Sequence, residues 1–116
     1  MKLGIVMLAV ADMNRSVAFY RDTLGLTAKG SGAEFSFFDA GGVTLSLRTT
    51  QDLKPSGDER RVELVFNVED ITAAYEQLKS RGCSFRLEPR EATGNQLVAD
   101  FRDPDGHVLS IFGPRG

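Results

Sequence analysis

Residues 10–26, with the sequence VADMNRSVAFYRDTLGL, decide the fold of this chain. An apolar run ends at Val10, and Asp12 or Asn14 can cap the helix that follows it. Four apolar side chains recur at helical spacing and form one stripe: Met13, Val17, Tyr20 and Leu24. Gly25 favours an end to the helix, because glycine adopts the left-handed conformation without strain. The stretch therefore predicts a buried strand followed by an amphipathic helix.

The same pattern returns in the second half of the chain. Val68-Glu69-Asp70-Ile71 repeats Val10-Ala11-Asp12-Met13 at an offset of 70 minus 12, or 58 residues. A second repeat relates the turn at residues 39–42 to the turn at residues 103–106, at an offset of 106 minus 42, or 64 residues. The difference of six residues predicts a longer loop in the second copy, around residues 88–95.

Each copy is predicted to have the element order β-α-β-β-β. The first copy is expected to form strands at residues 3–10, 26–29, 35–38 and 43–47. The second is expected to form strands at residues 62–68, 83–87, 97–102 and 107–112, with a helix lined by Ile71, Tyr75 and Leu78 and ended by Arg81-Gly82. Residues 49–61 are polar and contain Pro55, Ser56 and Gly57, which is typical of a linker. We predict one α+β domain over residues 1–116, with module one at 1–48, the linker at 49–61 and module two at 62–113.

Composition narrows the classes of partner. The 116 residues are 41% hydrophobic, and 14 basic and 16 acidic residues give a net charge of -2, which predicts no binding to nucleic acid or to an anionic membrane. The lone Cys83 excludes an internal disulfide and fits a reducing compartment. Lys2 and the apolar run after it imitate a short signal peptide, but the run is better explained as the first strand. We expect a cytoplasmic protein whose partner is a small molecule or another protein.

Two segments resemble a known superfamily. Residues 10–26 are similar to the opening helix of vicinal oxygen chelate proteins, which include glyoxalases, bleomycin resistance proteins and ring-cleaving dioxygenases. Residues 101–107, FRDPDGH, resemble their closing turn. The resemblance implies curved mixed sheets around a cavity, with the helices on the convex side. It also implies a homodimer, because many members pair with ligand sites between modules.

Enzymes of this superfamily hold a divalent metal with His and Glu side chains, which the resemblance places at four positions here. Those positions hold Ile5, Ser46, Glu63 and Ser110, of which only Glu63 can act as a strong ligand. We therefore expect no metal site and no cofactor, with a divalent metal as the less favoured alternative. The single histidine, His107, follows the closing turn and is expected to point away from the site.

Strand alternation predicts the wall of the cavity. Besides Glu63, the residues expected to line it are Ile5, Met7, Thr44, Ser46, Arg48, Val65, Asn67, Val108, Ser110 and Phe112. Such a mainly apolar wall with a few polar points is typical of a small-molecule pocket. Glu63 is the candidate general base, and the alternative is an ion pair with Arg48 or Arg61. Arg48, Arg90 and Arg102 could bind an anionic group or lie on the surface, and Asp100 is expected to pair across the sheet.

The resemblance, weighed against these residues, implies three possible functions. The first is metal-independent binding or sequestration of a small apolar or aromatic molecule by a protein of the bleomycin resistance type. The alternative is a glyoxalase-like lyase, isomerase or dioxygenase that uses a divalent metal or Glu63 as a general base. The third is an interaction module that acts through its dimer surface. In such a module the protein's own side chains would fill the cavity. No residue pattern specifies the ligand.

Overall fold

The computed structural model describes residues 3–50 and 62–116. The chain divides into two compact units, residues 1–55 and 56–116, and each unit holds one sheet. Most of the predicted linker lies outside the described residues, and its first residue, Thr49, belongs to a strand.

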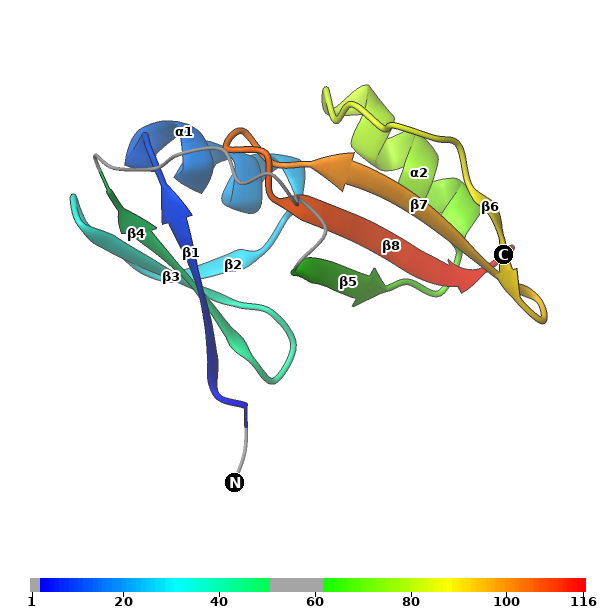
Figure 1. The fold of residues 1–116 in the computed structure, drawn as a ribbon, viewed down its shortest axis with the longest axis horizontal. Coiled ribbons are helices and arrows are strands. Elements are labelled where there is room, and N and C mark those ends of the chain that lie inside the picture. Colours follow the sequence, from blue (N-terminus) through cyan, green and yellow to red (C-terminus); the bar gives the residue numbers. More distant parts are fainter. Residues whose placement is uncertain (1–2, 51–61) are drawn as a thin grey trace. The chain divides into compact units, whose positions relative to one another are not determined.

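The first unit contains β1 (Ile5–Val10), α1 (Met13–Ala18), a short π-helix η1 (Phe19–Thr23), β2 (Thr27–Ser31), β3 (Phe35–Asp39) and β4 (Thr44–Thr49) (Figure 1). Its strands lie in the order β1-β4-β3-β2. β1 and β4 are parallel, and the other neighbours are antiparallel.

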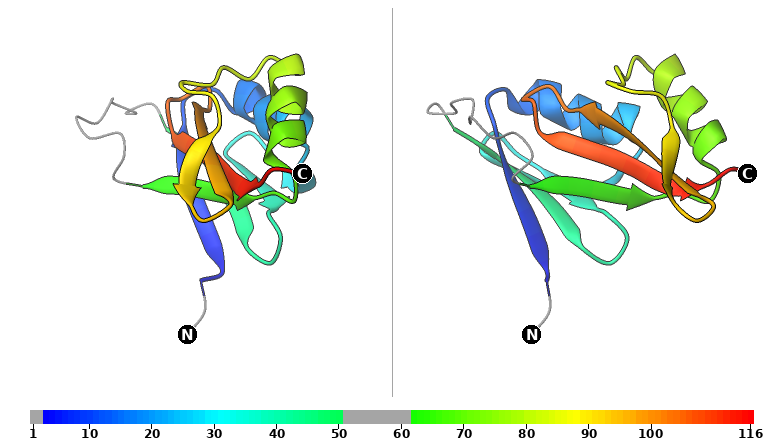
Figure 2. Two further views of the ribbon diagram at one scale, coloured as in Figure 1. Left: turned by 90° about the vertical axis from the view of Figure 1, so that its right-hand side faces the viewer. Right: turned by 45° about the vertical axis from the view of Figure 1, so that its right-hand side comes forward.

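The second unit repeats this plan with β5 (Glu63–Asn67), α2 (Ile71–Ser80), β6 (Arg90–Thr93), β7 (Gln96–Arg102) and β8 (Val108–Pro114). Its strand order is β5-β8-β7-β6, with a parallel β5–β8 pair. Within each unit the helix contacts the strands of its own sheet (Figure 2). The α+β fold class with two βαβββ modules is thus confirmed.

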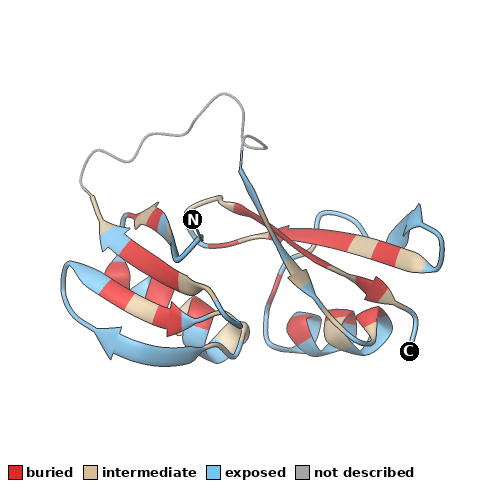
Figure 3. Ribbon diagram, turned by 90° about the horizontal axis from the view of Figure 1, so that it is seen from below, coloured by how far each residue is buried: buried red, intermediate tan, exposed pale blue. Residues whose placement is uncertain are grey.

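The repeated aspartates begin both helices. Asp12 and Asp70 each accept a hydrogen bond from the backbone N–H three residues later, over 3.1 Å, which satisfies a donor that the first helical turn leaves without a partner. Behind these caps, apolar side chains of helix and sheet form the core. In the first unit the core consists of Leu8, Val10, Met13, Val17, Tyr20, Phe38, Leu45 and Leu47. Figure 3 shows buried residues that alternate with more exposed ones along the strands and helices.

The prediction of a strand at residues 83–87 is wrong. That segment makes only an isolated bridge between Phe85 and Phe101, and the strand lies instead at Arg90–Thr93, in the stretch predicted to be a loop. The ring centroid of Phe85 lies 4.6 Å from that of Tyr75 and 5.1 Å from that of Phe101. The apolar residues of this segment therefore do not indicate a strand of the sheet, because Phe85 packs against aromatic rings of the core.

The first helix also differs from the regular helix expected. α1 ends at Ala18 and η1 continues it, which leaves Leu24 only half-buried. Gly25 then adopts a φ of 79°, as the sequence predicts for a helix end. None of the helices in residues 3–50 and 62–116 has the length and apolar character needed to span a membrane.

Candidate functional site

Each sheet has one face that packs on its own helix and an opposite face, which we call the first and the second open face. Strand register places on the first open face alternate residues of β1, β4 and β3: Ile5, Met7, Ala9, Thr44, Ser46, Arg48, Phe35, Phe37 and Asp39. It places on the second open face alternate residues of β5, β8 and β7: Glu63, Val65, Asn67, Val108, Ser110, Phe112, Val98, Asp100 and Arg102. Every residue predicted to line the cavity belongs to one of these two faces.

The first open face is apolar and exposed. Ile5, Met7 and Phe35 are 55%, 47% and 41% exposed. The rings of Phe35 and Phe37 are stacked, with centroids 6.5 Å apart and an interplanar angle of 11°. Thr44, at the end of the face, accepts a hydrogen bond of 2.6 Å from Lys29 Nζ. The face thus offers exposed aromatic and aliphatic side chains, with Ser46 among them and further polar groups at the border.

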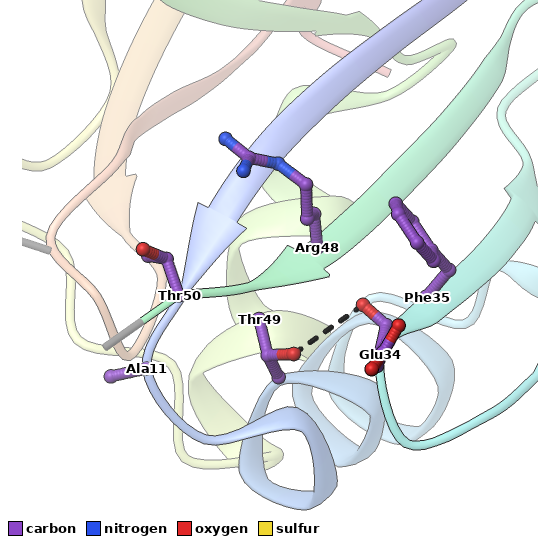
Figure 4. A pocket seen from close by; sticks show the side chains of 6 residues that line it. All are labelled: Ala11, Glu34, Phe35, Arg48, Thr49 and Thr50. Atoms are coloured by element: carbon purple, nitrogen blue, oxygen red, sulfur yellow. Dashed lines mark hydrogen bonds between the residues drawn. The ribbon is translucent and has the colours of Figure 1, made fainter. Parts of the chain in front are cut away.

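A hollow of about 480 Å³ lies at the end of this face where β4 ends. It is lined by Ala11, Glu34, Phe35, Arg48, Thr49 and Thr50. Phe35 and Arg48 are cross-strand neighbours, and Figure 4 shows their side chains projecting to the same side of the sheet. Two of the lining residues are joined by a backbone hydrogen bond, in which the N–H of Thr49 donates to the carbonyl oxygen of Glu34 over 3.0 Å. An aromatic ring and a guanidinium group thereby stand side by side.

The second open face is more polar. Glu63 and Asn67 are exposed at the two ends of β5, and Val65 between them is 52% exposed. Arg61, one of the partners expected for Glu63, lies outside the described residues. Beside β5, the β8 residues Val108 and Ser110 are buried.

Ser46 and Ser110 occupy the centres of the two open faces. Both side chains are fully buried, and neither hydroxyl makes a hydrogen bond with any described residue. A buried hydroxyl without a partner typically costs about 1–3 kcal/mol. The two faces therefore share an unsatisfied polar group at the position where the resemblance places a metal ligand.

His107 and Cys83 are accounted for by local structure. His107 Nδ1 lies 2.7 Å from Asp103 Oδ2, and this hydrogen bond raises the pKa of the imidazole although burial opposes the shift. The same carboxylate accepts the backbone N–H groups of Asp105 and His107, so it organises the closing turn. Burial raises the pKa of the Cys83 thiol to about 11, which leaves it protonated at neutral pH.

Comparison with known proteins identifies the family. Residues 2–111 match the Glyoxalase/Bleomycin resistance protein/Dioxygenase superfamily. The chain belongs to this superfamily. This confirms the resemblance to vicinal oxygen chelate proteins that residues 10–26 and 101–107 predicted.

Individual relatives of the superfamily are distant in sequence. An uncharacterized protein of Bacillus subtilis, YraH, is 30% identical over 125 residues, which span 97% of this chain and 98% of that protein. A manganese-dependent 2,3-dihydroxybiphenyl 1,2-dioxygenase of Geobacillus genomosp. 3 is also 30% identical, but the match spans 96% of this chain and only 36% of the dioxygenase. The crystal structure of a superfamily protein from Nocardioides superposes with a TM-score of 0.84 at 26% identity, over 99% of this chain and 84% of that one.

The residues at the four metal-ligand positions do not fit a divalent ion. Ile5 has no donor atom, and the hydroxyls of Ser46 and Ser110 are weak neutral donors compared with imidazole or carboxylate. Glu63 supplies one carboxylate, whereas divalent metal sites in proteins need several such ligands. Within the described ranges, no group of three His, Cys, Asp or Glu side chains could hold a metal ion.

One cluster was not predicted from the sequence. Asp100 is paired with Arg90 and lies near Arg86, and neither of these arginines belongs to β7 itself. The expected pairing across the sheet thus involves β6 and the segment before it. The pairing of Arg90 with Asp100 was missed because the residues of β6 were predicted to form a loop. Arg90 was therefore not expected on a strand next to Asp100.

Proposed function

We propose that this chain binds a small organic molecule with an apolar or aromatic body on its first open face, without a metal ion. The observation that carries the proposal is the exposure of Ile5, Met7 and Phe35 on one sheet face around the buried Ser46. Apolar surface gathered on one face, with few polar groups, is typical of a small-molecule site. An aromatic ligand would stack on Phe35, whose ring already stacks on Phe37.

Arg48 is the polar group that would orient such a ligand. It is exposed, and its guanidinium makes no hydrogen bond or ion pair with any described residue. Guanidinium groups bind carboxylates through two parallel hydrogen bonds. We propose that an acidic group of the ligand occupies the hollow at the end of the face, next to Arg48, while its ring covers Phe35.

The proposal favours binding or sequestration over catalysis. Among the described residues, the first open face and the hollow at its end carry no histidine or cysteine. Of their two carboxylates, Asp39 accepts the backbone N–H of Gly41 over 2.9 Å, and Glu34 lines the hollow. The alternative is a metal-free lyase or isomerase in which Glu63 moves a proton, and the observation that favours it is the exposed position of Glu63 on the second open face. Loss of turnover in Glu63→Gln with ligand binding retained would support this alternative.

A pair of probes tests the binding proposal. Purified full-length protein is titrated with 1-naphthoate and with neutral 1-naphthalenemethanol, and binding is followed by naphthalene fluorescence. Phe35→Ser should weaken both probes, whereas Arg48→Gln should weaken only naphthoate, by about tenfold, because a charge-assisted hydrogen bond contributes roughly 1.5–3 kcal/mol. Val65→Ser changes an exposed apolar site on the second open face; it is the matched control and should leave both affinities unchanged.

The proposal fails if neither probe binds saturably to the folded protein. It also fails if Val65→Ser weakens the probes as much as Phe35→Ser does, because the probes would then bind any apolar surface.

A homodimer in the cytoplasm remains a prediction. The homodimer is supported by exposed apolar side chains in both units, among them Ile5, Met7 and Val65, because association would remove them from water. Light scattering after size exclusion should give twice the mass of the chain, 12.7 kDa. If naphthoate binding disappears as the dimer forms, the open faces are filled by a second copy and the chain is an interaction module instead.

A further inference from the structure

The two open faces share one strand register but differ in chemistry. On the first face, Ser46 lies between Met7 and Phe37, and on the second face Ser110 lies between Val65 and Asp100. Asp100 therefore stands where the first unit has an aromatic ring. Since the first unit builds the same strand arrangement with Phe37, the fold itself does not require a carboxylate at this position.

Two arginines accompany the buried carboxylate of Asp100, which is 1% exposed. Arg90 Nη1 donates to Asp100 Oδ1 over 2.9 Å, and Arg86 Nε lies 3.8 Å from Asp100 Oδ2. Arg86 is held at this place because its backbone N–H donates to the Asp100 carbonyl oxygen over 3.0 Å. A buried carboxylate needs a compensating cation, and one guanidinium would neutralise it. The group of three thus carries one positive charge in excess.

Most of the hydrogen-bond donors of these arginines are not used by Asp100. The side chains of Arg86 and Arg90 are 45% and 42% exposed, and they make no other hydrogen bond or ion pair with any described residue. Each guanidinium has five N–H donors in a fixed plane, of which Asp100 takes only a few. Asp100 orients Arg90 through a carboxylate hydrogen bond and positions Arg86 through its backbone carbonyl, so less side-chain entropy is lost when the two arginines bind an anion.

Apolar side chains lie beside Arg90. Arg90 pairs in register with Val98, and Val98 pairs with Phe112, so the three residues form a row across β6, β7 and β8. Val98 and Phe112 are both half-buried and therefore accessible in part. An anion at the arginines could thus extend its apolar part along this row. The unsatisfied hydroxyl of Ser110 belongs to the same face, next to Asp100.

We infer that Arg86 and Arg90, oriented by Asp100, form a binding site for an organic oxyanion, a carboxylate or a phosphate ester, whose apolar body lies on Val98 and Phe112. This site belongs to the second unit, and it does not depend on the ligand proposed for the first open face. The chemistry it recognises is an oxygen anion attached to an apolar group.

The site is tested by NMR on full-length protein labelled with ¹⁵N. Inorganic phosphate and phenyl phosphate are titrated at constant ionic strength, with chloride as the reference anion, and the Arg Nε–Hε signals are followed. We expect saturable shifts of the Arg86 and Arg90 signals, with phenyl phosphate bound at least about tenfold more tightly, because its ring buries apolar surface. Benzoate should shift the same signals, which would show that the site binds carboxylates as well as phosphate esters.

Variants separate this site from ordinary surface charge. Arg90→Gln should weaken phenyl phosphate about tenfold or more, since a charge-assisted hydrogen bond is lost. Arg86→Gln should act in the same direction and perturbs folding less, because its Nε lies beyond hydrogen-bond distance from Asp100. Arg21→Gln is the matched control: Arg21 also pairs with an aspartate, Asp22, but both side chains are more than half exposed, so affinity should not change.

Three results would overturn the inference. The first is the absence of any saturable shift beyond that caused by chloride, which would make the cluster purely structural. The second is equal affinity for inorganic phosphate and phenyl phosphate, which would remove the apolar part of the site. The third is an equal loss of affinity in Arg21→Gln and Arg86→Gln.

Discussion

Ser46 and Ser110 occupy equivalent positions at the centres of the two sheets, and each buries a hydroxyl that makes no hydrogen bond with any described residue. Each serine lies four residues after the glycine that ends a turn, at Gly42 or Gly106. At these positions the superfamily resemblance places metal ligands, so the serines mark the site where this chain departs from the metal-binding pattern.

Replacing either serine should not destabilise the fold. Ser46→Ala and Ser110→Ala remove an unsatisfied hydroxyl but keep the Cβ, so the free energy of unfolding should stay unchanged or rise by up to about 1 kcal/mol. Urea denaturation measures the effect. Ser36→Ala is the control, because Ser36 is equally buried but its hydroxyl lies 3.2 Å from Met13 Sδ and 3.4 Å from Ser31 Oγ, and its loss should cost about 0.5–1.5 kcal/mol. A clear loss of stability in the Ser46 and Ser110 variants would show that their hydroxyls have partners in solution.

Gly113 should be intolerant of a side chain. A Cβ at this position would overlap the carbonyl oxygen of Val68, whose N–H donates to the Phe112 carbonyl oxygen over 2.9 Å. Gly113→Ala should therefore lower the free energy of unfolding by about 1–3 kcal/mol, the usual cost of overpacking. Gly4→Ala, where no atom lies within 4 Å of the new Cβ, should have little effect. Equal stabilities of the two variants would contradict the close approach of Val68.

The pair of His107 and Asp103 should make stability depend on pH. Because the pKa of His107 is raised in the folded state above its usual value of 6.5, protonated His107 stabilises the fold. This stabilisation is fully present at pH values below the pKa of His107 in the unfolded chain. It is lost as the pH rises through the pKa of His107 in the folded protein. The difference in unfolding free energy between the parent chain and His107→Gln should thus be larger at about pH 5.5 than at about pH 9. Urea denaturation at both pH values checks this, and a difference that grows with pH would refute the pairing.

The sequence predicted those parts of the fold that bury apolar side chains. The repeated stretches after Val10 and Val68 predicted both helices. Asp12, one of two residues expected to cap the first helix, does so, and its repeat Asp70 caps the second. Strands β2 and β6 were located poorly or missed, because every residue in them is exposed and gives no apolar alternation. Edge strands of this kind are held by backbone hydrogen bonds to a neighbour, which single-residue patterns do not report.

The candidate site was likewise predicted only in part. The strand register places Met7, Ser46 and Ser110 on the open faces, and their role in lining a ligand cavity stays a prediction. The stacked Phe35 and Phe37 also belong to the first open face, but the residues predicted to line the cavity did not include them. The link between Asp100 and its two arginines depends on where β6 lies, which the sequence did not reveal.

We propose that this member of the superfamily works without a metal ion, because the positions where the resemblance places metal ligands hold Ile5, Ser46 and Ser110. The most direct test is the metal content of the purified protein, combined with its thermal stability in the presence of Mn²⁺, Zn²⁺, Ni²⁺ or EDTA. We predict less than stoichiometric metal and an unchanged melting temperature, because an ion that does not bind the folded state cannot stabilise it by mass action. One equivalent of bound metal, with a melting temperature that rises with metal and falls with EDTA, would contradict the account and favour a metal-dependent enzyme.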